Sequence, residues 1–226
     1  MSLQTAHRRA LVAGGTGRVG GAIAERLRAD GWQVIAAGSA DGDLRRRSGA
    51  VQLVSAAVER LGGLDLVVHA AGDGFVAAPF EQVTEEAWDA AMDVTAKGTF
   101  FLAQAAAPTL RAAKGVLVIV EDVAAFRPWT SFAAHSAAKA AQAMLTRVLA
   151  RALAPEVRVC GIAPGPVAVE PGQEERRAAE TLLGRVGAPQ DVADAVVYLA
   201  GAGYVTGTTL VVDGGALVKS RGAALP

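Results

Sequence analysis

The chain has 226 residues, 52% of them hydrophobic and 19% charged, which is enough for one large α/β domain with a full core. The 22 basic and 22 acidic side chains give a formal net charge of zero, so nothing favours a nucleic-acid or acidic-membrane partner. A single cysteine, Cys160, excludes an intramolecular disulfide and a cysteine-based metal cluster, and we expect no bound metal. Because no stretch of roughly 18 apolar residues is free of charge, we expect a soluble, cytoplasmic protein without a membrane span.

A glycine-rich turn near the start organises the rest of the chain. Residues 10–13 form a short apolar run, which is typical of a strand buried on both faces of a parallel sheet. Residues 22–32 then show helical spacing of apolar side chains. The first N–H groups of a helix are unpaired and carry partial positive charge, so a phosphate can bind where glycines let the backbone approach. Strand, glycine turn and helix therefore predict dinucleotide binding, with a purely structural turn as the alternative. The turn residues expected at the cofactor are Gly14, Thr16, Gly17, Arg18, Val19 and Gly20.

The next apolar run, 33–37, ends about 20 residues beyond the turn, where dinucleotide-binding folds often place an acidic residue on the adenosine ribose. Ser39 occupies this position, and the first acids are Asp41 and Asp43. A missing carboxylate removes the repulsion that excludes a 2′-phosphate, and Arg18 supplies a positive charge that could hold one. We therefore expect NADPH in preference to NADH.

Strand and helix patterns alternate along the rest of the chain, without a repeat or a linker. Further strands are predicted at 64–71, 116–120, 157–163 and 208–212, and helices at 48–61, 87–109, 133–154 and 188–199. Thr84 is expected to cap the second of these helices and Pro108 to stop it, while Thr130 or Ser131 caps the third. The polar stretch 170–180 has the composition of a flap over a site. This order predicts one dinucleotide-binding domain over residues 1–226, with a parallel sheet covered by helices on both faces.

Seven stretches carry a resemblance to the short-chain dehydrogenase/reductase family that covers almost the whole chain. They are AGGTGRVG at 13–20, HAAG at 69–72, DVTAKGTF at 93–100, HSAAK at 135–139, APGPV at 163–167, GAPQDVA at 187–193 and TGTTLVVDGG at 206–215. The resemblance implies a Rossmann-type doubly wound sheet and NAD(P)H-dependent oxidoreduction of a small-molecule substrate. It also implies a homodimer or homotetramer, formed through the helices at 87–107 and 133–154.

Within that family, the chain is similar to the pteridine reductase branch at two positions. Arg18 takes the central glycine position of the turn, where it is expected to contact the adenosine phosphate, and Asp122 takes the position of the catalytic serine. The resemblance implies adenine contacts by Asp43 and Leu44 and a ribose contact by Lys139. The other cofactor contacts that it implies are Ser39, His69, Ala70, Ala71, Pro164, Gly165 and Val167.

The catalytic positions depart from the family pattern. The usual tyrosine of Tyr-x-x-x-Lys is His135, and the catalytic asparagine aligns with Thr95, so Lys139 alone is retained. His135 and Lys139 lie four residues apart, on one face of a helix. A nearby ammonium disfavours an imidazolium, whereas a nearby carboxylate stabilises it, so Asp122 with His135 can act as a general acid. The catalytic candidates are therefore Asp122, His135, Lys139 and Thr95.

The chain is also short after its second strand. Where the family has a helix and an edge strand, residues 39–47 pass almost directly to the next helix. Loss of an edge strand leaves the central strand pairings intact, so we expect the fold to survive.

Two functions from different classes are compatible with these residues. The first is an NADPH-dependent reductase of a carbonyl or pterin-like substrate, with a His/Asp/Lys site. The second is a non-catalytic nucleotide-binding or partner protein that kept the scaffold after losing its tyrosine.

Overall fold

The computed structural model describes residues 8–72 and 75–219. Within them, six parallel strands form one sheet in the order β2-β1-β3-β4-β5-β6. The strands are β1 (Arg9–Ala13), β2 (Gln33–Ala37), β3 (Leu66–His69), β4 (Val116–Val120), β5 (Arg158–Pro164) and β6 (Thr209–Val212). The order runs outward in both directions from β1 and β3, so the predicted doubly wound parallel sheet is confirmed.

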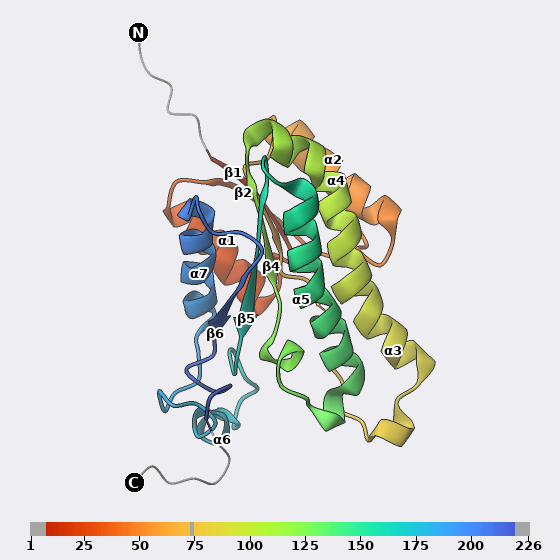
Figure 1. Ribbon diagram of the computed structural model, residues 1–226, viewed down its shortest axis with the longest axis vertical. Helices are drawn as coiled ribbons and strands as arrows, with labels where there is room; N and C mark the ends of the chain where they lie inside the picture. Colours follow the sequence, from red (N-terminus) through yellow and green to blue (C-terminus); the bar gives the residue numbers. More distant parts are fainter. Residues whose placement is uncertain (1–7, 73–74, 220–226) are drawn as a thin grey trace.

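Helices cover both faces of the sheet (Figure 1). On one face lie α1 (Arg18–Ala29) and α7 (Pro189–Gly201), and on the other α2 (Arg47–Leu61), α4 (Gly98–Ala113) and α5 (Ala133–Leu153). Adjacent residues of a strand point to opposite faces, so Val67 packs in the core with Leu110 of α4, and Val68 in the core with Ile23 of α1. This explains why the strand sequences are continuous apolar runs. No helix in the described ranges is both long and apolar enough to cross a membrane.

The sheet is shortened at the β2 edge, as predicted. Residues 38–46 lead from β2 directly into α2, and the only strand paired with β2 in the described sheet is β1. Gly49 at the start of α2 makes this connection tight, because an added Cβ would collide with the backbone of Asp43. Leu44 is buried in the core and lies against Gly98 of α4. The shortened connection therefore still closes over the core.

The predicted end at Pro108 is wrong. Instead of one helix over 87–109, α3 (Glu85–Met92) continues through a π-helical turn (Asp93–Lys97) into α4, which passes Pro108 and ends at Ala113. A proline removes one backbone hydrogen bond, but α4 buries a whole apolar face against the sheet, and this packing outweighs the loss.

The helix caps agree only in part with the prediction. Thr84 does cap α3, since its hydroxyl accepts a hydrogen bond from the backbone N–H of Ala87 at 3.2 Å. Neither Thr130 nor Ser131 caps α5, because both belong to a 3₁₀ turn (Thr130–Phe132) that runs straight into it. The predicted flap contains the short helix α6 (Glu174–Ala178), below the carboxyl ends of β5 and β6 in Figure 1.

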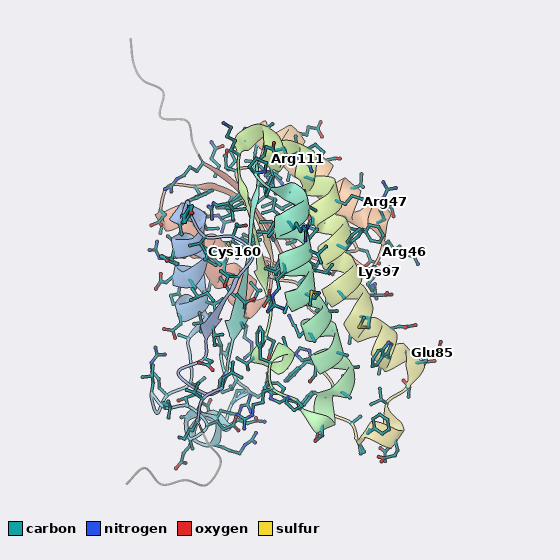
Figure 2. All side chains as sticks on the ribbon, viewed as in Figure 1. Arg46, Arg47, Glu85, Lys97, Arg111 and Cys160 are labelled. Carbon is teal, nitrogen blue, oxygen red and sulfur yellow. The ribbon has the colours of Figure 1, made fainter. Side chains whose placement is uncertain are left out.

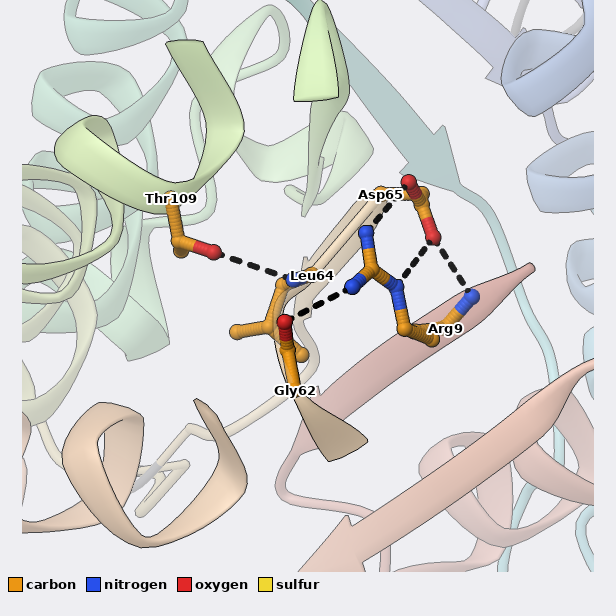
Figure 3. Close-up of polar contacts among 5 residues, drawn as sticks. All are labelled: Arg9, Gly62, Leu64, Asp65 and Thr109. Atoms are coloured by element: carbon orange, nitrogen blue, oxygen red, sulfur yellow. Dashed lines mark hydrogen bonds and ion pairs between the residues drawn. The ribbon is translucent and has the colours of Figure 1, made fainter. Parts of the chain in front are cut away.

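Polar contacts join β1 and β3 at the amino edge of the sheet (Figure 3). The guanidinium of Arg9 donates from Nε and Nη2 to the two carboxylate oxygens of Asp65, at 2.9 and 3.0 Å, and from Nη1 to the carbonyl of Gly62. Burial opposes ionisation of Asp65, but the hydrogen bonds from Arg9 outweigh it and lower the pKa of Asp65. The backbone N–H of Leu64 donates to Thr109 Oγ1, which ties α4 to the same edge.

Several basic side chains lie on the surface, and the single cysteine lies in the interior (Figure 2). Arg46 and Arg47, part of the one basic run, project outward at α2, and Lys97 projects from the π-helical turn before α4. Cys160 lies inside the sheet, where burial raises the pKa of its thiol.

A buried carboxylate follows β4. Glu121 accepts hydrogen bonds from the hydroxyls of Thr146, at 2.5 Å, and Thr209, at 2.9 Å. Burial raises the pKa of Glu121 against the effect of these bonds. The space for this side chain exists because residue 161 on β5 is glycine, since an added Cβ would collide with the carboxylate. Glu121 and Gly161 are therefore a steric pair.

We expect Gly161→Ala to lower the free energy of unfolding by about 1–3 kcal/mol through overpacking, as measured by urea denaturation. In a Glu121→Ala background, the same substitution should cost much less, because the colliding carboxylate is gone. Gly201→Ala is the control, since an added Cβ there meets no described atom within 4 Å. An equal cost of Gly161→Ala in both backgrounds would contradict the steric pairing.

Candidate active site

An open cleft of about 1600 Å³ lies at the carboxyl edge of the sheet. Its walls come from the start of α1, the loop after β4, the start of α5, the loop after β5 and α6. The carboxyl ends of parallel strands are the usual ligand sites of open α/β sheets. Of the candidate residues, the cleft is lined by Arg18, Asp122, His135, Lys139, Gly165 and Val167.

The glycine turn fits the diphosphate of a dinucleotide. Gly14 has a φ of +84°, and a Cβ there would lie 2.5 Å from the backbone nitrogen of Ala71, so only glycine allows β1 and β3 to approach at this point. A Cβ on Gly20 would collide with the carbonyl of Gly14. Helix α1 has no side-chain cap and no acidic residue in its first turn, so its N–H groups remain available to an anion. Val19 packs partly buried beneath the turn.

Arg18 is the first residue of α1, but its guanidinium contacts the loop after β5. It forms an ion pair with Glu170, at 2.8 Å, and a longer hydrogen bond to the carbonyl of Val169, at 3.4 Å. Both side chains of the pair are well exposed. Glu170 therefore competes with any phosphate for Arg18.

The end of β2 carries a carboxylate that the sequence spacing did not reveal. Gly38 packs so closely on Thr16 that a Cβ would lie 2.8 Å from its hydroxyl oxygen. The backbone N–H of Gly38 donates to Asp41 Oδ2 at 2.8 Å, so this turn brings the Asp41 carboxylate back to the end of β2. Asp41 is the first acid after Ser39 in the sequence, but its spacing alone does not show that it folds back in this way.

The adenine-side candidates have structural partners of their own. Asp43 accepts hydrogen bonds from the backbone and the side chain of Arg45, and these bonds lower the pKa of Asp43. The side chain of Leu44 is in the core, so its backbone alone remains for a cofactor. At the next strand end, the N–H of Ala70 is already bonded to the carbonyl of Ala13.

The candidates at the end of β5 shape the nicotinamide side of the cleft. Pro164 is the buried last residue of β5, and Gly165 donates its N–H to the carbonyl of Val212. Gly165 is packed against Asp213, since a Cβ would lie 2.6 Å from the Cβ of that residue. Val167 forms an isolated bridge with Gly187. These contacts fix the backbone that follows β5.

Lys139 on α5 is almost fully buried behind the cleft. Its ammonium donates to the carbonyl of Val120 and to Gln142 Oε1, each at 3.0 Å. Burial lowers the pKa of Lys139, and the charges of Asp122 and Glu121 partly offset this. The ammonium is thus held at the end of β4 by fixed acceptors.

Gln142 connects Lys139 to the other buried polar groups. Its amide nitrogen donates to Thr99 Oγ1 at 2.9 Å and lies 3.4 Å from the carbonyl of Thr95 and from His69 Nδ1. Thr95 is therefore joined to Lys139 through its backbone, while its own hydroxyl is buried without a described partner. The sequence reasoning missed Gln142, although a glutamine three residues after Lys139 in an alanine-rich helix was the available signal.

His69 is an unsuitable proton donor. It is fully buried, and burial together with the charge of Lys139 lowers its pKa from 6.5 to about 4. The imidazole is therefore neutral near neutral pH.

His135 and Asp122 are brought together at the cleft. His135 Nε2 lies 3.5 Å from Asp122 Oδ2, and neither ring nitrogen has a hydrogen-bond partner among the described residues. The ring of Phe75 meets His135 edge-on at a centroid distance of 4.9 Å, and Trp129 lies nearly parallel to it at 6.4 Å. The imidazole therefore sits in an apolar surrounding with one carboxylate beside it.

No tyrosine replaces the missing one. The chain has two tyrosines, both within the described residues. Tyr198 and Tyr204 are 59% and 104% exposed and do not line the cleft. Neither tyrosine can therefore act as a proton donor in the described cleft.

The parallel sheet, the glycine turn and the cleft at its carboxyl edge define a Rossmann-type nucleotide-binding protein. Residues 22–216 match the family model described as Enoyl-(Acyl carrier protein) reductase. The 3beta-hydroxysteroid dehydrogenase 1 of Eggerthella lenta is 35% identical, and the match covers 91% of this chain and 92% of that protein. The chain belongs to the short-chain dehydrogenase/reductase family, whose relatives here are oxidoreductases.

Solved structures agree with this assignment. A short-chain dehydrogenase/reductase (glucose/ribitol dehydrogenase) from Brucella melitensis superposes with a TM-score of 0.84 at 29% identity, covering 92% of this chain and 96% of that one. A blue fluorescent protein from a metagenomic library, solved in complex with NADPH, gives 0.83 at 27% identity, covering 92% and 97%.

We expect the low pKa of His69 to make the fold sensitive to acid. The unfolded chain binds a proton on His69 below about pH 6.5 and the folded chain only near pH 4, so the free energy of unfolding falls as pH drops through this window. The full effect is on the order of 3 kcal/mol. His69→Asn should flatten this part of the stability curve, as measured by urea denaturation from pH 7 to 4, whereas His135→Asn should retain it. Parallel curves for wild type and His69→Asn would refute the prediction.

Proposed function

We propose that this protein is an NADPH-dependent oxidoreductase that reduces a carbonyl or pterin-like small molecule, with His135 as the proton donor. The observation that carries this proposal is the juxtaposition of His135, Asp122 and Lys139 at the cleft that begins at the glycine turn. The relatives support the reaction class. Pterins are included because the sequence is similar to pteridine reductases at Arg18 and Asp122.

Three side chains, those of Lys139, His135 and Asp122, have separate roles in the proposed reaction. NADPH, when bound, supplies a hydride, and Lys139 would hold its ribose hydroxyls. His135 would donate a proton to the carbonyl oxygen of the substrate and regain one from solvent afterwards. The carboxylate of Asp122 lies 3.5 Å from His135 Nε2 and would hold the imidazole in place. Water must be excluded from this step, and the rings of Phe75 and Trp129 supply the apolar cover.

Two side chains act in opposite directions on the proposed preference for NADPH. Arg18 favours a phosphorylated ribose or diphosphate, and a solved neighbour carries NADPH. Asp41 at the end of β2 acts against a 2′-phosphate. Titration of the purified protein with NADPH and NADH, followed by nicotinamide fluorescence, tests the proposal. Tighter binding of NADPH supports it, and binding of neither overturns it.

We expect Asp41→Asn to shift the ratio of dissociation constants toward NADPH by about 1.5- to 5-fold, which is the range for an exposed charge interaction. The binding of NADH should change less, because it lacks the 2′-phosphate. Glu59→Gln removes an exposed charge of the same sign from α2 and serves as the control. If both variants shift the ratio equally, the effect belongs to overall charge and not to Asp41.

We expect His135→Phe to lower kcat by about 10²- to 10⁴-fold, the usual contribution of a general acid, while the dissociation constant for NADPH stays within twofold. Steady-state kinetics and the same fluorescence titration measure the two effects. His135→Tyr distinguishes a working imidazole from a lost tyrosine. Lower activity of this variant supports the His135–Asp122 pair, and a gain of activity would contradict it.

A non-catalytic nucleotide-binding protein is the second candidate. The specific observation in its favour is that both nitrogens of His135 are buried without a described hydrogen-bond partner. Tight NADPH binding with no turnover of any carbonyl or pterin substrate, restored by His135→Tyr, would support it. A homodimer or homotetramer and a cytoplasmic location stay predictions.

A further inference from the structure

Beyond His135, the cleft carries aromatic rings and cations to which the proposed function assigns no contact with the substrate. Phe75, Trp129 and Phe132 form one aromatic cluster, in which Phe75 stacks on Phe132 at 4.4 Å and Trp129 meets Phe132 at 5.9 Å. Phe75 is 57% exposed, so the cluster is open on one side. A flat ring that enters the cleft can extend this cluster by stacking or edge contact.

The cleft has an excess of positive charge. Six cationic side chains line it against three carboxylates. Two of those carboxylates are already taken, since Glu170 pairs with Arg18, and Glu180 pairs with Arg176 and Arg177. The third, Asp122, faces His135. The cations without a carboxylate partner in the described ranges are Arg127, Lys139 and Lys219.

These three cations differ in how many hydrogen-bond donors remain. Lys139 is buried with two acceptors, and Lys219 donates to the carbonyls of Ala179 and Thr181 at 2.8 and 2.9 Å. Arg127 is half-buried and makes one described hydrogen bond, from Nη1 to the carbonyl of Ala216 at 3.2 Å. A guanidinium carries five N–H donors in a planar fork. Arg127 therefore keeps most of its donors for a ligand in the cleft.

The loop after β4 carries a carboxylate, a cation and an aromatic ring within one short segment. Asp122, which faces His135, comes five residues before Arg127, and Trp129 follows two residues later. All three line the cleft. Arg177 of α6 lies 5.8 Å from the ring of Trp129 and adds positive charge on that side. A guanidinium fork binds a carboxylate through two parallel hydrogen bonds.

We propose, on the basis of the proposed function, that the substrate is a planar-ring carbonyl compound that bears a carboxylate. Arg127 binds the carboxylate, Trp129 contacts the ring, and the reactive carbonyl lies toward His135. Arg127 is thus a specificity-determining residue, distinct from the groups that transfer the proton.

The test compares phenylglyoxylate with its neutral amide, phenylglyoxylamide, as ligands of the full chain. Dissociation constants are measured by isothermal titration calorimetry, with and without saturating NADP⁺. Wild type should bind the carboxylate about 10- to 100-fold more tightly than the amide, which is the range for a charge-assisted hydrogen-bonded pair. Arg127→Gln should bring the ratio close to one, and Arg127→Lys should leave an intermediate ratio because it keeps the charge and loses the fork.

Two further variants separate local recognition from general effects. Arg176→Gln removes a cation of the same cleft that is already bonded to Gln173 and Glu180, and it should keep the wild-type ratio. Trp129→Leu should weaken both compounds equally and also keep the ratio. Thermal unfolding confirms that each variant is folded.

The outcomes distinguish this inference from the proposed function. A wild-type protein without a preference for the carboxylate, including one that binds neither compound, overturns the substrate class even if it binds NADPH. So does an Arg127→Gln variant that keeps the preference. If NADPH does not bind but the preference and its loss in Arg127→Gln are seen, the reductase is overturned and the ring-and-carboxylate site remains.

Discussion

The site depends on burying one ammonium group, that of Lys139, at the end of β4. A charged group loses its hydration on burial and must find fixed acceptors in return. The carbonyl of Val120 supplies one, but the next comes from a side chain, Gln142, on the following turn of α5. The amide of Gln142 then needs partners for its own hydrogens, and Thr99 and the carbonyl of Thr95 provide them. The π-helical turn between α3 and α4 holds this carbonyl at the cluster.

The two described histidines, His69 and His135, lie in different electrostatic surroundings. His69 lies in full burial and in the field of Lys139, so it stays neutral and serves as packing at the end of β3. His135 is buried in the wall of the cleft, with the carboxylate of Asp122 3.5 Å from its Nε2. The proposed proton donor is thus the imidazole beside a carboxylate, and not the one in the field of the ammonium.

The strands, helices and glycine turn could be predicted from the sequence, whereas the conformations of loops and of one helix end could not. The glycine turn and the alternation of strands and helices follow from apolar runs and their spacing, which core burial enforces, and the shortened β2 edge follows from the family resemblance. The hydrogen-bond partners of Asp41 and Arg127 depend on the backbone conformation of single loop residues. The spacing of apolar residues carries no information about that conformation. Pro108 shows a third case, in which the packing of a whole helix face overrides a local signal.

The contact of Glu121 with Gly161 links the residues that two neighbouring strands can carry. A side chain at position 161 would meet the far end of Glu121, so the carboxylate would have to move. Such a move takes it away from the hydroxyls of Thr146 and Thr209, its hydrogen-bond partners in the interior. A substitution on β5 would therefore act through a buried polar group that loses partners on α5 and β6, and not through lost space alone.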